Sequence, residues 1–217
     1  MRRDLFAGII VPLSILLPIG IFIPRYKYAS KELKAIFYYL VMVSLISFVA
    51  IVLKNQKINN LPLLHVYTIL EAGFIFYYFK TVFKNEAANR IINFLMVVFP
   101  ALCIVNFSFF QSIYKFNTYT RPLEAILITI LCIIYFFKSG FFERWIKMPV
   151  NWINMGIMSY FPAASIIFIL SNTFVFKSYD RDLNILVWDL HALLVLIMYL
   201  LFAKAFSLIR VKPEDNT

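Results

Sequence analysis

Three apolar segments of the chain carry an ionisable residue between a leucine and an alanine: Glu71, Glu124 and His191. An ionisable side chain inside an apolar, membrane-length segment is costly, and it therefore marks a candidate functional site. A carboxyl in such a place is tolerated when it has a cationic partner, when water fills a cavity beside it, or when it takes up a proton. The three residues therefore point to ligand binding, to ion or proton transfer, or to a structural ion pair.

Helical spacing indicates which neighbours the two acids can meet. Arg121 stands three positions before Glu124, and Tyr67 stands four positions before Glu71, so each pair shares one helix face. Glu71 also follows Pro62 by about nine residues, which places it roughly 13 Å below the start of its helix. Glu124 is closer to its own helix start. We therefore expect Glu71 to be the deeper of the two acids.

The two histidines extend this polar set to a third helix. Trp188 and His191 are three positions apart and share a face, whereas the intervening Asp189 points elsewhere. His65 lies in the same segment as Glu71. We predict that these groups line one ligand-binding pocket, whose residues are His65, Tyr67, Glu71, Arg121, Glu124, Trp188, Asp189 and His191.

Other roles for the same residues stay open. An interhelical lock of ion pairs and hydrogen bonds would use them to fix the register of the helices. A metal site made of His65, His191 and an acid is weakly indicated, because no two histidines stand at the i, i+4 spacing of a helical metal motif. Haem ligation by both histidines is geometrically allowed but weaker still. We predict no bound metal, no cofactor and no catalytic residue.

The composition identifies the class of protein that carries these residues. The chain has 217 residues, of which 62% are hydrophobic and 15% charged, and its mean hydropathy is +0.81. These values are typical of an integral membrane protein. A span needs about 20 mainly apolar residues, and we predict an all-α transmembrane bundle, a single domain over residues 1–217. Its seven spans run approximately over 6–24, 36–53, 61–80, 91–111, 121–138, 150–172 and 184–207.

The basic residues predict the orientation of this bundle. The net charge is +10, but lysines and arginines stand at span ends and form no separate module, so we expect no nucleic acid partner. With the N-terminus outside and the C-terminus inside, 13 of them fall on the inner side and 8 on the outer side. Arg2 and Arg3 precede an apolar run, as in a signal peptide. No small-residue cleavage site follows, so we expect a retained helix.

Pro162 lies near the centre of the sixth predicted span, flanked by Gly156, Ser159 and Ser165. A proline in a span frees a backbone carbonyl that a neighbouring hydroxyl, helix or water must satisfy. We predict a kink at Pro162, either as a moving hinge or as a packing feature.

Several short stretches carry a resemblance to known proteins. They are residues 64–71 (LHVYTILE), 151–154 (NWIN) with Tyr160-Phe161, and 188–191 (WDLH). Together they resemble a set of small bacterial seven-helix membrane proteins of no assigned function. The resemblance implies a multi-pass protein of a bacterial cytoplasmic (inner) membrane and little more.

These observations favour a non-enzymatic, sensor-like or ligand-binding protein with an outward-facing polar pocket. Its partners would be the lipid bilayer, a small ligand or ion from the outer side, and a membrane or cytoplasmic protein that receives the output. A small transporter or proton-coupled carrier that uses Glu71 and Glu124 is the alternative. A membrane-embedded enzyme comes third.

Overall fold

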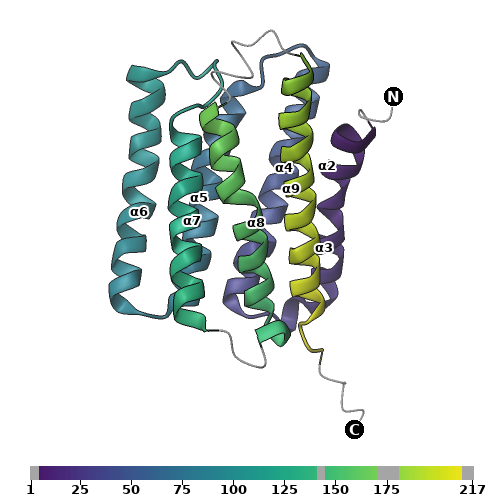
Figure 1. The fold of residues 1–217 in the computed structure, drawn as a ribbon, viewed down its shortest axis with the longest axis vertical. Helices are drawn as coiled ribbons and strands as arrows, with labels where there is room; N and C mark the ends of the chain where they lie inside the picture. Colours follow the sequence, from purple (N-terminus) through teal and green to yellow (C-terminus); the bar gives the residue numbers. More distant parts are fainter. Residues whose placement is uncertain (1–4, 141–144, 171–180, 212–217) are drawn as a thin grey trace.

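The computed structural model describes residues 5–140, 145–170 and 181–211, and these residues form helices joined by short connections (Figure 1). The elements are η1 (Phe6–Ile10), α2 (Val11–Ser14), α3 (Leu16–Phe22), η2 (Ile23–Tyr28), α4 (Lys31–Asn55), α5 (Leu61–Phe83), α6 (Glu86–Val105), η3 (Asn106–Phe110), α7 (Thr120–Ser139), η4 (Trp145–Lys147), α8 (Pro149–Leu170) and α9 (Arg181–Ser207).

Within the described residues, seven helical stretches are long and apolar enough to cross a membrane, and this confirms the all-α class and the number of predicted spans. They are Phe6–Tyr28, Lys31–Asn55, Leu61–Phe83, Glu86–Phe110, Thr120–Ser139, Pro149–Ile169 and Asp182–Ser207. Several begin or end a few residues beyond the predicted bounds, because helical hydrogen bonding continues past the apolar stretch that hydropathy detects. The predicted end of the sixth span, residues 171–172, lies outside the described residues.

The first of these stretches is the least regular. Two short α-helical pieces, α2 and α3, are preceded by the π-helical turn η1 and followed by the 3-10 helix η2. Pro12, Pro18 and Pro24 fall in this stretch, and each proline removes a backbone N–H that a regular helix would use. The prolines therefore account for a first span assembled from short pieces.

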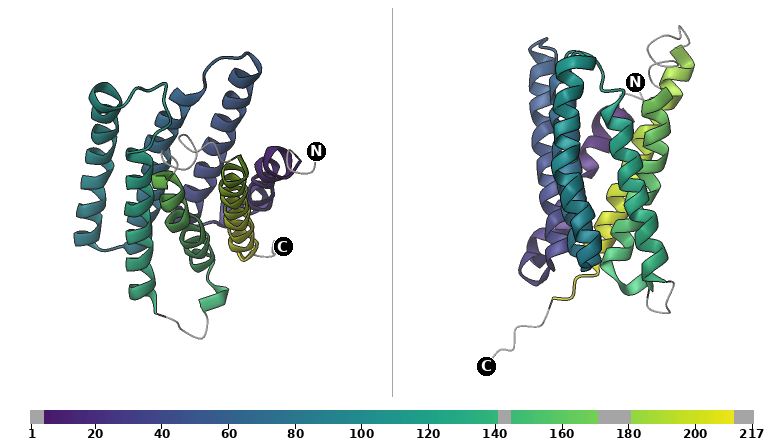
Figure 2. Two further views of the ribbon diagram at one scale, coloured as in Figure 1. Left: turned by 45° about the horizontal axis from the view of Figure 1, so that its top comes forward. Right: turned by 90° about the vertical axis from the view of Figure 1, so that its left-hand side faces the viewer.

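The helices stand in two rows (Figure 2). One row contains α6, α5 and α4, and the other contains α7, α8 and α9 with α2 and α3 at its edge. The rows touch where α5 packs against α7 and where α4 meets α8. We call the end where α5 and α9 begin the upper end, as it is drawn in Figure 1. Near this end the rows separate between α4 and α9, which leaves room for the cavities described below.

Helix α8 lies in the middle of the bundle and packs closely on α9. A Cβ added at Gly156 would lie 2.7 Å from the ring of Phe202, so only glycine allows this approach. The helix continues through Pro162, and the Ser165 hydroxyl donates a hydrogen bond of 2.7 Å to the Pro162 carbonyl oxygen. A serine therefore bonds the backbone beside the proline, while a hinge at Pro162 stays a prediction.

A polar cluster in the lower half ties α8 to two other helices. The Asn154 amide donates to the Tyr78 hydroxyl of α5 at 2.6 Å, and the Cys132 thiol of α7 donates to the Asn154 carbonyl oxygen at 3.2 Å. Tyr135 donates to the Asn151 amide oxygen. These contacts fix the lower parts of α5, α7 and α8 against one another.

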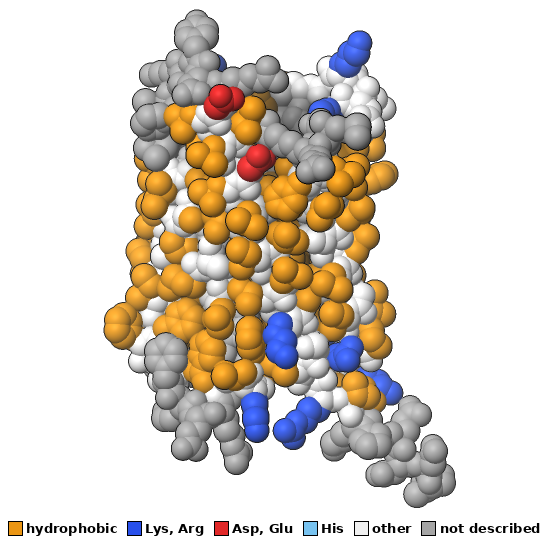
Figure 3. All heavy atoms as spheres, turned by 45° about the vertical axis from the view of Figure 1, so that its right-hand side comes forward, with side chains coloured by type: hydrophobic (Ala, Val, Ile, Leu, Met, Phe, Trp, Pro, Cys, Tyr) orange, Lys and Arg blue, Asp and Glu red, His pale blue; other side chains and the backbone are white. Residues whose placement is uncertain are grey.

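The surface carries the apolar band expected of a membrane protein. On the face shown in Figure 3, hydrophobic side chains cover the middle, and lysine and arginine side chains gather toward the lower end. Large exposed apolar residues of the protein include Leu13, Leu16, Leu193 and Leu200. Such a band, together with seven membrane-length helices, indicates a multi-pass membrane protein.

Candidate functional site

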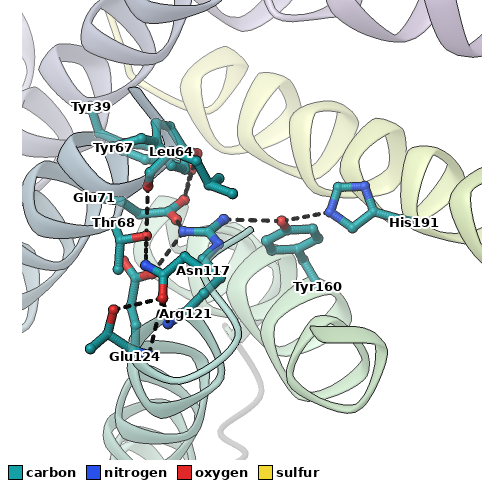
Figure 4. A network of polar contacts seen from close by, with 11 residues as sticks. Tyr39, Leu64, Tyr67, Thr68, Glu71, Asn117, Arg121, Glu124, Tyr160 and His191 are labelled. Atoms are coloured by element: carbon teal, nitrogen blue, oxygen red, sulfur yellow. Dashed lines mark hydrogen bonds and ion pairs between the residues drawn. The ribbon is translucent and has the colours of Figure 1, made fainter. Parts of the chain in front are cut away.

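Near the middle of the bundle, one guanidinium nitrogen binds two carboxylates (Figure 4). Arg121 Nη1 forms an ion pair with Glu71 Oε2, and it donates to Glu124 Oε2 at 2.7 Å. All three side chains are buried, with exposed fractions of 4%, 0% and 0% for Arg121, Glu71 and Glu124. Arg121, from the first turn of α7, is therefore the shared partner of an acid on its own helix and an acid on α5.

The two carboxylates are not equivalent. Glu71 Oε1 accepts hydrogen bonds from the hydroxyls of Tyr39, at 2.6 Å, and Tyr67, at 2.8 Å. Both oxygens of Glu71 are thus bonded. Glu124 Oε1 and Arg121 Nε are buried without a hydrogen-bond partner among the described residues. The cluster therefore holds Glu71 firmly and leaves one carboxylate oxygen of Glu124 unsatisfied.

Asn117 places Arg121 beside Glu71. Its amide oxygen accepts from the backbone N–H of Thr120 at 3.1 Å and of Arg121 at 3.3 Å, and also from the Thr120 hydroxyl at 2.8 Å. Its amide nitrogen donates to the Thr68 hydroxyl of α5 at 3.2 Å. Asn117 therefore satisfies free N–H groups at the start of α7 and attaches that start to α5.

The prediction that Glu71 lies deeper in the bundle than Glu124 is wrong. Glu71 stands ten residues after the start of α5, or about 15 Å, and Glu124 stands four residues after the start of α7, or about 6 Å. Since both bind the same nitrogen, α7 begins about 9 Å deeper in the bundle than α5. The connection before α7 enters the bundle, and Asn117 in it is completely buried. Depth counted from each helix start misses this displacement.

The network continues from Arg121 to two further helices. Arg121 Nη2 lies 3.5 Å from the Tyr160 hydroxyl of α8, and this hydroxyl lies 3.0 Å from His191 Nε2 of α9. The guanidinium carbon stands 4.8 Å from the Tyr67 ring centre and 5.0 Å from that of Phe168, which is cation–π geometry. With Tyr39 on α4, one polar network joins α4, α5, α7, α8 and α9 (Figure 4).

A cavity of about 400 Å³ lies on the upper side of this network. It extends from the start of α5 down to Arg121. Most of the polar or aromatic residues that line it carry a ring: Tyr67, Phe116, Tyr160, Phe168, Trp188, His191 and Tyr199. His191 packs edge-on against Tyr160 and Trp188, with ring centres 5.5 Å and 5.7 Å apart. The cavity is thus an aromatic chamber with the ion-pair cluster at its base.

The structure brings most of the predicted pocket residues together. Tyr67, Arg121, Trp188 and His191 line the cavity, and Glu71 and Glu124 bind Arg121 at its base.

Two predicted pocket residues lie apart from the cavity. His65 is 1% exposed, and its Nε2 lies 3.0 Å from the Lys115 carbonyl oxygen, so it holds the connection before α7. The His65 ring also packs edge-on against Phe107. Asp189 is half-buried on α9 and does not line the cavity. His65 therefore supports the position of Arg121 from outside the cavity.

Sequence reasoning missed several residues of the network and the cavity, among them Tyr39, Asn117, Tyr160 and Tyr199. Tyr39, Tyr160 and Tyr199 stand in apolar spans, where a tyrosine is as readily an interfacial or packing residue as a hydrogen-bond donor. Only the relative rotation of the helices shows which tyrosines face the carboxylates. Asn117 had a detectable signal, because Asn three residues before a helical Thr-Arg-Pro start is a capping pattern.

The fold and the site define a multi-pass helical membrane protein with a buried ion-pair cluster beside an aromatic cavity. Across the described ranges there is no group of three or more His, Cys, Asp or Glu side chains that could hold a metal ion. Comparison of the chain with protein-family models, curated proteins and solved structures finds no match. The function is therefore inferred from the site itself.

Proposed function

We propose that the protein binds a small uncharged ligand in the aromatic cavity and acts as a sensor-like or ligand-binding membrane protein, not as an enzyme. One observation carries this proposal: the base of the cavity is the network that joins five helices. The volume of about 400 Å³ falls in the range of small-molecule sites. A ligand seated there would touch groups that set the relative positions of α4, α5, α7, α8 and α9.

The charges around the cavity support an uncharged ligand. Arg121 is the only lysine or arginine among the described lining residues, and two carboxylates already offset its charge. An anion would thus meet no free positive charge. The side chains of His191 and Tyr199 line the cavity and are able to form hydrogen bonds with a ligand. A neutral ligand with an apolar body and one polar group fits these walls.

The orientation of the protein belongs to the same proposal. We place the N-terminus outside and the C-terminus inside a bacterial cytoplasmic membrane. The lower end of the bundle is then the inner end, and it carries the larger number of basic residues, as the positive-inside rule requires. The cavity then opens toward the outer side. Its ligand reaches Trp188 and His191 on α9, and α9 ends at Ser207 on the inner side. A protein partner at that side would receive the output through α9.

Filling the cavity is expected to weaken binding of 1-naphthol, a neutral aromatic probe with one hydroxyl. Leu64 lines the cavity, and Leu64→Phe would occupy part of it. We expect saturable binding to the wild-type protein in lipid vesicles, and a roughly tenfold weaker affinity in the variant, since one misplaced ring costs on the order of 1–3 kcal/mol. Equilibrium dialysis against protein-free vesicles of the same lipid measures both.

Leu70→Phe is the matched control, because Leu70 is on the same helix, is 39% exposed and does not line the cavity. Its affinity should equal that of the wild-type protein. If 1-naphthol binds the wild-type protein no better than it partitions into protein-free vesicles, the proposed site is contradicted. Equal affinities of all three proteins would place the bound naphthol elsewhere.

A proton-coupled carrier is the second candidate, and the composition of the cluster favours it. Two carboxyl groups share one guanidinium, so the cluster has one acid in excess when both are ionised. The excess acid can hold a proton, and the partnerless Glu124 Oε1 gives that proton a place. Tyr160 and His191 continue the hydrogen-bond chain to the cavity wall. Such chains of acids and histidine are typical of proton pathways in membranes.

A proton pathway through Glu124 is tested by flux in proteoliposomes. Potassium efflux with valinomycin draws protons inward, and an internal pH dye records their entry. A carrier should admit protons faster than empty vesicles do, and Glu124→Gln should return the rate to that of empty vesicles. Equal rates for empty vesicles and wild-type proteoliposomes would exclude a proton pathway that operates without a co-transported substrate.

A further inference from the structure

A second cavity, of about 590 Å³, adjoins the aromatic cavity. It lies between the α2–α3 stretch on one side and helices α4 and α9 on the other. The two cavities meet at five residues that line both of them: Ser47, Ala50, His191, Val195 and Tyr199. The two cavities are therefore neighbours that share part of their walls, and we call the second cavity the apolar groove.

The walls of the apolar groove differ from those of the aromatic cavity. No charged side chain lines the groove among the described residues. Its wall from η1, α2 and α3 is entirely apolar: Ala7, Val11, Pro12, Leu13, Ile15 and Leu16. The Ser44 hydroxyl is bonded to the Leu40 carbonyl oxygen at 2.9 Å. The other polar groups, Ser47, His191 and Tyr199, stand where the groove meets the aromatic cavity. The lining of the apolar groove thus becomes more polar toward the aromatic cavity.

The rim of the groove lies in the apolar band of the protein. Leu13, Leu16, Phe48 and Ile51 line it, and their side chains are 57%, 55%, 66% and 52% exposed. The α2–α3 stretch packs on α9 and meets α4 mainly through α3, so the space beside α2 is not closed by helix contact. In a bilayer these rim residues would face lipid chains. The groove is therefore accessible from the membrane.

We propose that the ligand is an amphiphile dissolved in the bilayer, with one apolar chain held in the groove and an uncharged hydrogen-bonding head in the aromatic cavity. This inference rests on the proposed function and names its ligand class. An apolar chain fits walls without charge, and the head reaches His191 and Tyr199 at the junction. A charged lipid head group would find no free cation there, because Arg121 is paired twice.

Photolabelling with a monoacylglycerol that carries a diazirine in its chain tests this assignment. The protein is reconstituted in phosphatidylcholine vesicles, illuminated and digested, and labelled residues are located by mass spectrometry. We expect labelling of α2–α3 and α4 residues at the groove that excess unlabelled monoacylglycerol suppresses. The lipid-facing side of α6, with Ile91 and Phe94, provides the background, and the competitor should not suppress its labelling.

A tryptophan at the junction should close the path between groove and cavity. Ser47 is exposed and lines both, so Ser47→Trp requires no repacking of a buried core. We expect the suppressible labelling to fall roughly tenfold. Ser108→Trp is the matched control, because Ser108 is exposed on η3 and lines neither cavity. It should leave labelling unchanged.

The possible failures are distinguishable. Suppressible labelling that is lost in Ser47→Trp and kept in Ser108→Trp supports the inference. Labelling that no competitor suppresses overturns it, and saturable binding of 1-naphthol would then still support the aromatic cavity as a small-molecule site. Suppressible labelling that Ser47→Trp does not change overturns the placement of the head in the cavity.

Discussion

Replacing Arg121 with leucine is expected to lower the free energy of unfolding by about 3–5 kcal/mol, the usual cost of removing one partner from a buried ion pair. Arg121 is 4% exposed, and its Nη1 is the only cation that contacts Glu71 and Glu124 within the described residues. Leucine would leave two completely buried carboxylates facing each other without a positive charge between them. No other lysine or arginine among the described residues lines the cavity to replace it.

The measurement uses the two buried free cysteines as reporters. Cys103 on α6 and Cys132 on α7 react with a thiol-specific dye only when the bundle opens. A titration with sodium dodecyl sulfate, followed by this reaction, gives the free energy of unfolding. Arg90→Leu is the matched control, because Arg90 is exposed at the lower part of α6, and its effect should stay within about 0.5 kcal/mol.

A third variant separates charge from shape. Arg121→Leu combined with Glu71→Gln and Glu124→Gln removes all three charges, so it should recover part of the stability that Arg121→Leu loses. If Arg121→Leu alone is as stable as Arg90→Leu, the carboxyl groups do not need the guanidinium, and the ion-pair cluster is not what holds α5 against α7.

The helices of this protein could be predicted from sequence because hydropathy and length determine them. Seven apolar stretches of membrane length give seven helices, and short connections force neighbours to run in opposite directions. The internal structure of the first stretch was harder to predict from the sequence. Its prolines indicate irregularity, but they do not determine which backbone N–H groups shift to π or 3-10 bonding.

The site was partly predictable, for a local reason. Pairs on one helix, such as Arg121 with Glu124 and Tyr67 with Glu71, follow from spacing alone, and both pairs are in contact. Contacts between helices depend on relative depth and rotation, which spacing does not contain. The buried connection around Asn117 lowers α7, and this brings Glu124 to the level of Glu71.

The same displacement decides the role of His65. The sequence places it close to Glu71, on the same helix, and near the predicted pocket. In the structure it binds the Lys115 carbonyl oxygen, in the connection that leads into α7. A polar residue predicted to bind ligand instead orients a backbone segment, and it affects Arg121 only through that segment.

Substituting the two acids one at a time should give unequal results. Glu71→Gln is expected to destabilise the protein by about 1.5–3 kcal/mol, the range for hydrogen bonds to charged groups. The carboxylate accepts from two tyrosine hydroxyls on one oxygen and binds Arg121 with the other. An amide has one acceptor oxygen, so glutamine cannot keep both sets of contacts as they are.

Glu124→Gln should change the free energy of unfolding by less than about 1 kcal/mol, or raise it. Glu124 uses only Oε2, so the glutamine oxygen can keep the bond to Arg121 while its NH2 group takes the place of the partnerless Oε1. The substitution also removes the acid in excess of the single guanidinium, which lowers the cost of buried charge. The sodium dodecyl sulfate titration compares the two variants under one set of conditions. If Glu124→Gln costs as much as Glu71→Gln, the ionised form of Glu124 is needed for folding, and neither the unequal roles of the two acids nor a proton held at Glu124 can be correct.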